Sequence, residues 1–221
     1  MVSQEAINMK QNRFPERLFI AGTDTGVGKT VISAILMAGL RGTYWKPVQC
    51  GLGEMTDTEW VRVKTGLPET NFHPETYRLK LPISPHASAA QEGAHIDLDD
   101  FRIPETKESE HLIVEGAGGI MVPLNERHFM LDLMKKLNIP VFLVVSSSLG
   151  TINHTLLSLE QLRMHGLDVD YVVINGPKNS SNREAIEYYG KVCVLAEIEP
   201  LPFINPQILA QSFKQYFEHA Q

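Results

Sequence analysis

The segment that most constrains this chain is the glycine-rich stretch at residues 22–30, Gly-Thr-Asp-Thr-Gly-Val-Gly-Lys-Thr. The apolar run at residues 18–21 predicts a buried strand, and residues 31–40 predict a helix packed on a sheet. The segment therefore ends at a helix N-terminus, where backbone N–H groups lack intrahelical partners and the helix dipole attracts an anion. This arrangement predicts a loop that binds the phosphates of a nucleotide.

Each residue type in this loop suits a role in phosphate binding. Gly26 and Gly28 let the backbone approach phosphate oxygens, Lys29 reaches the β and γ phosphates, and the Thr30 hydroxyl is placed to coordinate Mg²⁺. An ordinary glycine turn before a helix is the alternative. The Gly-Lys-Thr triplet in a strand-to-helix context favours the phosphate loop.

The spacing of the loop departs from the usual pattern of four residues between the first glycine and Gly28. Thr23 occupies the position of that first glycine, and Gly22 lies one residue earlier. Partition and division-site ATPases with a deviant phosphate loop carry an additional lysine where this chain has Asp24. The acidic residue is evidence against membership of that group.

Composition is typical of one enzyme-sized domain. The chain has 221 residues, of which 43% are hydrophobic and 21% charged, enough to bury a substantial core. A net charge of −6 argues against nucleic-acid binding, which requires a basic face. Cys50 and Cys193 are too few and too far apart for a metal cluster or a disulfide framework, so we expect a reducing, cytoplasmic location.

The sequence predicts a single domain preceded by a leader. Residues 1–16 are polar and interrupted by Pro15, so we expect a flexible leader there, followed by a single α/β domain over residues 17–221. No apolar run approaches the roughly 20 residues that span a bilayer.

Apolar runs alternate with amphipathic ones along the rest of the chain. This alternation predicts a doubly wound, mostly parallel sheet flanked by helices, as in P-loop NTPases. In such sheets ligands bind beyond the carboxyl ends of the strands, where Lys46, Glu115, Ser146 and Asn175 are expected. The predicted strands, besides 18–21, are 43–46, 111–115, 141–145, 170–174 and 192–196, and the predicted helices, besides 31–40, are 57–65, 129–137, 152–165, 182–189 and 207–219.

Residues 112–119, Leu-Ile-Val-Glu-Gly-Ala-Gly-Gly, form the second strong motif. Because an unpaired buried carboxylate is costly, Glu115 followed by three glycines in four residues indicates a nearby ligand, and Mg²⁺ would supply a partner. An exposed glutamate in a strand-end turn is the alternative. The local sequence does not decide the role of Asp57, because the helix dipole alone favours an acid in the first turn of a helix. It does not decide the role of Lys46 either, which could be a surface lysine.

Five motifs in one order resemble the dethiobiotin synthetase family, over about residues 18 to 201. The phosphate loop by itself is shared by many enzymes, whereas the set is highly specific. The motifs are residues 22–30, Tyr-Trp-Lys-Pro-Val (44–48), Ser-Pro-His (84–86) with Ala-Gln-Glu-Gly (90–93), Val-Glu-Gly-Ala-Gly-Gly (114–119) and Leu-Gly-Thr-Ile-Asn-His (149–154).

The resemblance implies an ATP-dependent cyclising ligase of biotin synthesis that forms a ureido ring from 7,8-diaminononanoate and CO₂ and releases ADP and phosphate. It implies that Thr30, Asp57 and Glu115 hold Mg²⁺ and that Lys29 and Lys46 are catalytic through their charge. No nucleophile–base pair stands out, which suits phosphoryl transfer.

The resemblance also implies a homodimer, in which the neighbouring subunit holds the substrate carboxylate. The implied substrate residues are Thr25, Lys46, Cys50, Gly150, Thr151, Ile152 and Asn153. The implied nucleotide residues are Gly26, Val27, Gly28, Lys29, Thr30, Val31, Asp57, Glu115, Gly116, Ala117, Gly118, Asn175, Gly176, Glu199, Pro200 and Leu201. On local sequence alone, Thr151 or Asn153 could be an ordinary helix N-cap and Asn175 a turn residue.

Some positions depart from the family pattern. Cys50 stands where a small hydroxyl residue is usual, Glu199 stands where proline is expected, and residues 96–111 are too few for the helix usually found there. Two rival functions remain open: another amide-forming ligase of the same fold, such as those acting on corrin carboxylates, and a ParA/MinD-like dimerisation switch without a small-molecule substrate.

Overall fold

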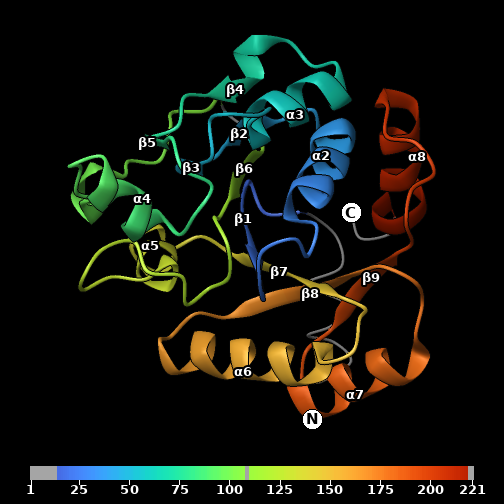
Figure 1. Cartoon of the computed structure of the whole chain (residues 1–221). Coiled ribbons are helices and arrows are strands. Elements are labelled where there is room, and N and C mark those ends of the chain that lie inside the picture. The colour runs from blue at the N-terminus through green and yellow to red at the C-terminus, as the bar shows by residue number, and fades with distance from the viewer. Residues whose placement is uncertain (1–13, 108–109, 219–221) are drawn as a thin grey trace.

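A single seven-stranded sheet organises the computed structural model, which describes residues 14–107 and 110–218 (Figure 1). All of its neighbouring strands run parallel, which confirms the predicted α/β class. In spatial order the strands are β4 (Phe72–His73), β2 (Thr43–Trp45), β6 (Leu112–Glu115), β1 (Arg17–Gly22), β7 (Val141–Ser146), β8 (Val169–Asn175) and β9 (Val194–Ile198). A separate parallel pair consists of β3 (Val48–Cys50) and β5 (Tyr77–Leu79).

Alternation along the strands divides the apolar side chains between two cores. Leu18 and Ile20 of β1 belong to one cluster, and Phe19 and Ala21 belong to the other. Both faces of the sheet are therefore covered, as the period of two in a strand requires. The helices that contribute to the first core are α2 (Lys29–Leu40), α3 (Asp57–Thr65) and α8 (Pro206–Phe217). Those that contribute to the second are α4 (Pro85–Gln91), α5 (Met130–Leu137), α6 (Thr151–Met164) and α7 (Ser180–Gly190).

Capping residues in the sequence set both ends of helix α3. The Thr56 hydroxyl accepts a hydrogen bond from the Glu59 amide, and the Glu59 carboxylate accepts one from the Thr56 amide, which completes a capping box. Gly66 then ends the helix at φ 66°, a left-handed conformation that suits glycine. These caps fix the position of Asp57 as the first helical residue.

The structure shifts some predicted boundaries. Strand β9 runs over Val194–Ile198 rather than 192–196, because Lys191 ends α7 in a left-handed conformation and the chain needs two residues to re-enter the sheet. Lys46 lies just beyond β2 rather than within it. The predicted helix 207–219 is α8, and its expected last residue, His219, lies outside the described residues.

Several short elements were not predicted, namely β3, β4, β5, α4 and the 3₁₀ turns η1 (Glu69–Asn71) and η2 (Leu98–Asp100). Their spans of two to seven residues are too short to show a period. The helix that is usual in the family between Ile96 and His111 was expected to be absent. The described residues of this segment form only η2.

The expected N-terminal leader falls mostly on residues 1–13, which lie outside the described residues. Phe14 is buried, with ring centroids 5.9 to 6.1 Å from those of Phe142, Phe213 and Phe217. The packed chain thus begins before residue 17. Among the described residues, no helix is both long and apolar enough to cross a bilayer.

Helix α2 packs against α8 at Gly39, where a substitution tests the packing. A Cβ atom at Gly39 would lie 2.0 Å from the Phe213 ring. Gly39→Ala should therefore destabilise the fold by about 1–3 kcal/mol, although alanine normally favours a helix interior. Urea unfolding measures the change. Gly53→Ala, where nothing lies within 4 Å of the added atom, is the control and should stay within about 0.5 kcal/mol of the parent. An unchanged midpoint for Gly39→Ala would contradict the packing.

Candidate active site

The predicted phosphate loop connects β1 to the N-terminus of α2. Gly28 is the N-cap of α2 and has φ 100°, and Gly26 has φ 76°, both in the left-handed region. A Cβ at Gly28 would lie 2.1 Å from Asn175 Nδ2, so packing as well as conformation requires glycine there. Asn175 Nδ2 itself donates to the Val27 carbonyl at 3.0 Å, which ties the end of β8 to the loop.

The Lys29 ammonium lies where loop and strand ends meet. It donates to the carbonyl of Asp24 at 2.9 Å and to that of Gly118 at 2.7 Å. Burial and the nearby Lys46 ammonium lower the pKa of Lys29 to about 8, against the attraction of Glu115. A buried lysine with this pKa gains from any anion that approaches it.

Glu115 is the centre of a buried polar cluster and has no exposed surface. Its Oε1 accepts from Thr30 Oγ1 at 2.9 Å and from Lys46 Nζ at 3.0 Å. Its Oε2 accepts from Ser33 Oγ at 2.7 Å and from the Tyr44 hydroxyl at 3.0 Å. Four donors therefore satisfy one carboxylate, which is how a buried charge is tolerated.

Asp57 joins the same cluster from α3. Its Oδ2 lies 2.7 Å from Lys46 Nζ, and its Oδ1 accepts from Thr30 Oγ1 at 3.2 Å. The Asp57 amide donates to Gln49 Oε1 at 3.1 Å, which orients the first turn of the helix. The alternative of an isolated helix-capping acid is therefore set aside for Asp57.

Lys46 is buried between these two carboxylates, so it is not the surface lysine that local sequence allowed. Burial alone would lower its pKa, but Glu115 and Asp57 together raise the pKa above its ordinary value. Burial would raise the pKa of Asp57, and the Lys46 ammonium outweighs that effect and lowers it. The cluster thus holds charged groups of both signs. Lys46 Nζ also donates to the Gly116 carbonyl at 3.0 Å.

The glycines after Glu115 bring the chain close to the phosphate loop. A Cβ at Gly116 would lie 2.9 Å from the Phe19 ring, and one at Gly119 would lie 3.0 Å from the Thr23 carbonyl. Gly118 has φ 64°. The turn therefore accepts no larger side chain, and its carbonyls receive Lys29 and Lys46.

Sequence reasoning missed Ser33 and Tyr44. Ser33 lies three residues after Thr30 on α2, and Tyr44 lies within β2, two residues before Lys46. Both spacings place a side chain on the same side as its predicted neighbour, and that pattern could have found them.

Thr30, Asp57 and Glu115 converge as predicted, since the Thr30 hydroxyl contacts both carboxylates. Hydroxyl and carboxylate oxygens are ligands that a hard cation such as Mg²⁺ prefers. Within the described ranges, no three His, Cys, Asp or Glu side chains form a metal-binding group, so any cation here would need the hydroxyl, phosphate oxygens or water as further ligands.

The remaining predicted residues lie around this cluster. Val27 is buried, Val31 packs against the first core, Ala117 packs against the second, and the Thr25 amide donates to Asp24 Oδ1 at 2.7 Å. Cys50 is half-buried, and burial raises the pKa of its thiol to about 11, which keeps the thiol protonated. None of these observations assigns a ligand to them.

Two predicted segments have no contact with the cluster among the described interactions. Gly150, at φ 96°, is the N-cap of α6, with Thr151 buried and Asn153 exposed. Gly176 follows β8 and donates to the Ile198 carbonyl at 2.8 Å. Beyond β9, Glu199 forms an exposed ion pair with Lys178 at 3.4 Å. Pro200 and Leu201 follow it, and Ile152 packs at the edge of the second core.

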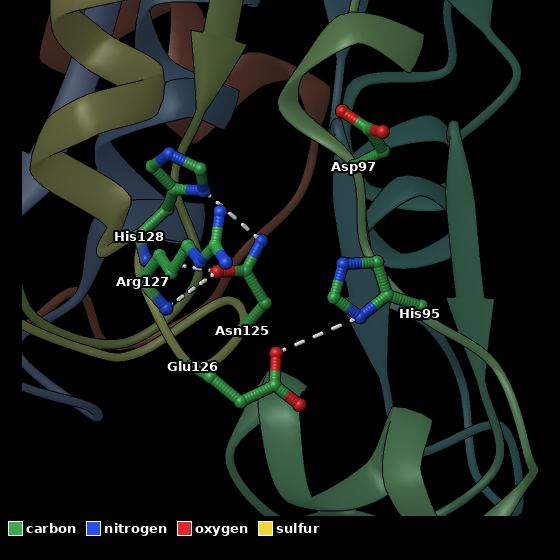
Figure 2. A pocket seen from close by; sticks show the side chains of 6 residues that line it. All are labelled: His95, Asp97, Asn125, Glu126, Arg127 and His128. Atoms are coloured by element: carbon green, nitrogen blue, oxygen red, sulfur yellow. Dashed lines mark hydrogen bonds and ion pairs between the residues drawn. The ribbon is translucent and has the colours of Figure 1, made fainter.

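A cavity of about 390 Å³ lies apart from this cluster, between residues 95–97 and the turn at residues 125–128 (Figure 2). Asn125 Nδ2 donates to the Ile96 carbonyl at 2.7 Å, and Asn125 Oδ1 accepts from the amides of Arg127 and His128. His95 faces Glu126 across the cavity at 3.7 Å. Because Asn125 is fully bonded, its role is to hold the turn against the preceding segment.

Comparison with known proteins decides the family. The ATP-dependent dethiobiotin synthetase BioD of Paramagnetospirillum magneticum is 49% identical over 87% of this chain and 92% of its own length. The chain belongs to the dethiobiotin synthetase family. BioD of Agrobacterium fabrum is 43% identical over 92% of this chain and 95% of its own length. A family model described as an AAA domain matches residues 16–207.

Solved structures agree on the fold that the dethiobiotin synthetase family shares with other P-loop NTPases. The MinC:MinD cell division protein complex of Aquifex aeolicus contains a chain with TM-score 0.56 and 15% identity, over 93% of this chain and 94% of that one. At this identity the likeness shows the fold alone.

The pKa of Lys29 predicts how nucleotide affinity depends on pH. Bound phosphate favours the ammonium form, so ADP affinity is full below about pH 8 and falls at higher pH as the unliganded protein loses that proton. Calorimetry should show a fall of roughly 25-fold between pH 7.5 and 9.5, because pH 9.5 lies about 1.5 units above this pKa and each unit corresponds to a tenfold change. In Lys29→Arg the guanidinium stays charged and the fall should vanish. Equal slopes in both proteins would contradict the assignment.

Proposed function

We propose that this chain is an ATP-dependent dethiobiotin synthetase, a cyclising ligase that makes dethiobiotin from 7,8-diaminononanoate and CO₂ in biotin synthesis. The observation that carries the proposal, beside the family relationship, is the second buried lysine. Lys29 is the lysine that a phosphate loop needs, and Lys46 converges with it on the turn that follows Glu115. A second buried ammonium suits a second anion, and a carbamate beside the γ-phosphate is such an anion.

The reaction balances as three bond-forming steps. One amine of the substrate adds to CO₂ and loses a proton, which gives a carbamate. A carbamate oxygen then takes the γ-phosphoryl group, and ADP leaves. The second amine attacks the carbamate carbon, the bond from that carbon to the phosphate oxygen breaks, and phosphate leaves as the amine loses its proton. Ring closure benefits from proximity, since both amines belong to one molecule.

Residues of the cluster would hold Mg²⁺ during phosphoryl transfer. Thr30 Oγ1, Asp57 and Glu115 would be its protein ligands, and the ion would neutralise charge on the β and γ phosphates. The support is the donor set, because the Thr30 hydroxyl lies 3.2 Å from Asp57 Oδ1 and 2.9 Å from Glu115 Oε1.

Lys46 would exchange partners during the cycle. Without ligands its ammonium pairs with Asp57 and Glu115. When a cation compensates those carboxylates, Lys46 becomes available to the carbamate, while Lys29 remains on the phosphates. Electrostatic stabilisers of this kind commonly contribute on the order of 10²-fold to the rate.

The nucleotide base would lie on the other side of the loop, toward the ends of β8 and β9. Asn175 is the polar side chain that contacts the loop there, through the Val27 carbonyl. Gly176 and residues 199–201 would complete the base site, with the Lys178–Glu199 ion pair at its edge. The Thr25 and Cys50 side chains belong to the substrate side of the proposal.

We place the substrate carboxylate at the N-terminus of α6 in the partner subunit of a homodimer, at residues 150–153. Helix N-termini bind anions through their unpaired amides. Large apolar side chains support an interface nearby: Met121 and Leu157 line a cavity of about 240 Å³ beside Asp24, and are 44% and 58% exposed. Leu149, directly before the helix, is fully exposed. Exposed large apolar side chains are typical of an interaction surface.

Neither rival function gains support from the cluster. A nucleotide switch without a small-molecule substrate gives no reason to bury Lys46 between two carboxylates, and the likeness to MinD concerns the fold alone. Relatives at 43% and 49% identity are named dethiobiotin synthetases, which disfavours a ligase acting on corrin carboxylates. We place the reaction in the cytoplasm, the reducing compartment that two widely spaced cysteines favour.

An assay with Mg-ATP and bicarbonate, with and without 7,8-diaminononanoate, tests the function. Dethiobiotin by mass spectrometry and ADP should appear in equal amounts and only with the diamine. Lys29→Ala should abolish both, because the phosphate loop loses its cation. ADP production that ignores the diamine, with no dethiobiotin, would contradict the ligase and support the switch.

Mixed dimers test the shared site. Gly150→Asp places a carboxylate and backbone strain at the N-terminus of α6, and Lys29→Ala disables the phosphate loop, so each variant alone should be inactive. Random mixing should restore roughly a quarter of the parent activity, since half of the dimers are mixed and each has one intact site. If residues 150–153 served the site of their own subunit, mixing would restore nothing.

A further inference from the structure

The two oxygens of Glu115 have partners of different kinds. Oε1 faces the polar cluster and accepts from Thr30 and Lys46. Oε2 faces the first core and accepts from Ser33 and Tyr44. The carboxylate therefore has one side turned toward the proposed ligands and one side turned into the protein.

The groups on the inner side are fixed. Ser33 and Tyr44 both have no exposed surface, and the Tyr44 ring belongs to the core formed with α2 and β1. Neither hydroxyl has another recorded partner among the described residues, and both are used on Oε2.

We propose that Tyr44 and Ser33 are positioning residues that hold Oε2 of Glu115, so that Oε1 alone is presented to the magnesium ion. The proposal rests on the proposed function, which names Glu115 as a ligand of that ion. It assigns two residues that no motif of the family resemblance used as site residues.

The arrangement answers a physical problem in the proposed cycle. When Lys46 turns to the carbamate, Glu115 loses the ammonium at 3.0 Å while remaining wholly buried. Two hydrogen bonds from fixed hydroxyls would hold the orientation of the carboxylate during that exchange. Outer-shell partners of this kind typically change metal affinity by about 10- to 100-fold when they are removed.

A purely structural role makes a different prediction. If the hydroxyls only satisfied a buried carboxylate, their loss would lower stability and leave the dependence on Mg²⁺ unchanged. Nucleotide binding without the diamine separates the two roles, because it needs no catalysis.

The experiment measures ADP affinity by calorimetry over a Mg²⁺ titration and in EDTA, for the parent, Tyr44→Phe and Ser33→Ala. The controls are Tyr77→Phe, which removes a phenol that donates to Asp100 away from the site, and Ser212→Ala, a buried serine on α8. For Tyr44→Phe and for Ser33→Ala we expect the Mg²⁺ concentration at half-effect to rise about tenfold or more. Affinity in EDTA should change by less than about twofold, and the controls should follow the parent.

An unchanged Mg²⁺ dependence in both variants would overturn the proposal, as would an equal rise in the controls. If Tyr44→Phe does not fold, Ser33→Ala carries the same test from the other hydroxyl. Absence of any Mg²⁺ dependence in the parent would overturn both this proposal and the metal assignment. Failure of the ligase itself is seen separately, as missing dethiobiotin in the parent assay.

Discussion

The structure depends on how one wholly buried carboxylate is compensated. Glu115 has no exposed surface, and removing a charge from water costs several kcal/mol unless partners replace the solvent. Its four donors come from two elements and the residue that follows one of them: Thr30 and Ser33 from α2, Tyr44 from β2, and Lys46 directly after β2. The placement of β6 between β1 and β2 in the sheet is what lets these elements meet at one strand end.

The same compensation makes the site responsive to ligands. Without a bound cation, the Lys46 ammonium pairs with Asp57 and Glu115. The Lys29 ammonium donates to two backbone carbonyls, and a phosphate could replace these acceptors. A nucleotide bound as proposed would therefore meet charged groups that already have partners, and these groups would exchange those partners for phosphate oxygens and a cation. Because the charges are buried and held by capped helices and strand ends, the exchange requires small movements of two lysine side chains rather than a new fold.

Motifs made of consecutive residues could be predicted from the sequence, whereas contacts between residues far apart in the chain could not. The phosphate loop and the turn after Glu115 are contiguous motifs with one structural context each, and both were predicted. The roles of Lys46 and Asp57 were undecided on local sequence, because a lysine before proline and an acid at a helix start have ordinary uses. The pairing of β2 with β6 brings Lys46 to Glu115, and the start of α3 brings Asp57 to Lys46. Tyr44 and Ser33 were missed because their partner lies on a third element, and β3, β5 and α4 because they are too short to show a period.

In the proposed cycle, Lys46 leaves the carboxylates for the carbamate when the site is filled. A crystal structure with Mg²⁺, a non-hydrolysable ATP analogue, bicarbonate and 7,8-diaminononanoate measures this directly. We expect a cation on Thr30, Asp57 and Glu115 Oε1, with the Lys46 ammonium on the carbamate and no longer paired with Glu115. A Lys46 ammonium that still bridges Asp57 and Glu115, with the diamine and its carbamate bound beyond its reach, would contradict this exchange of partners.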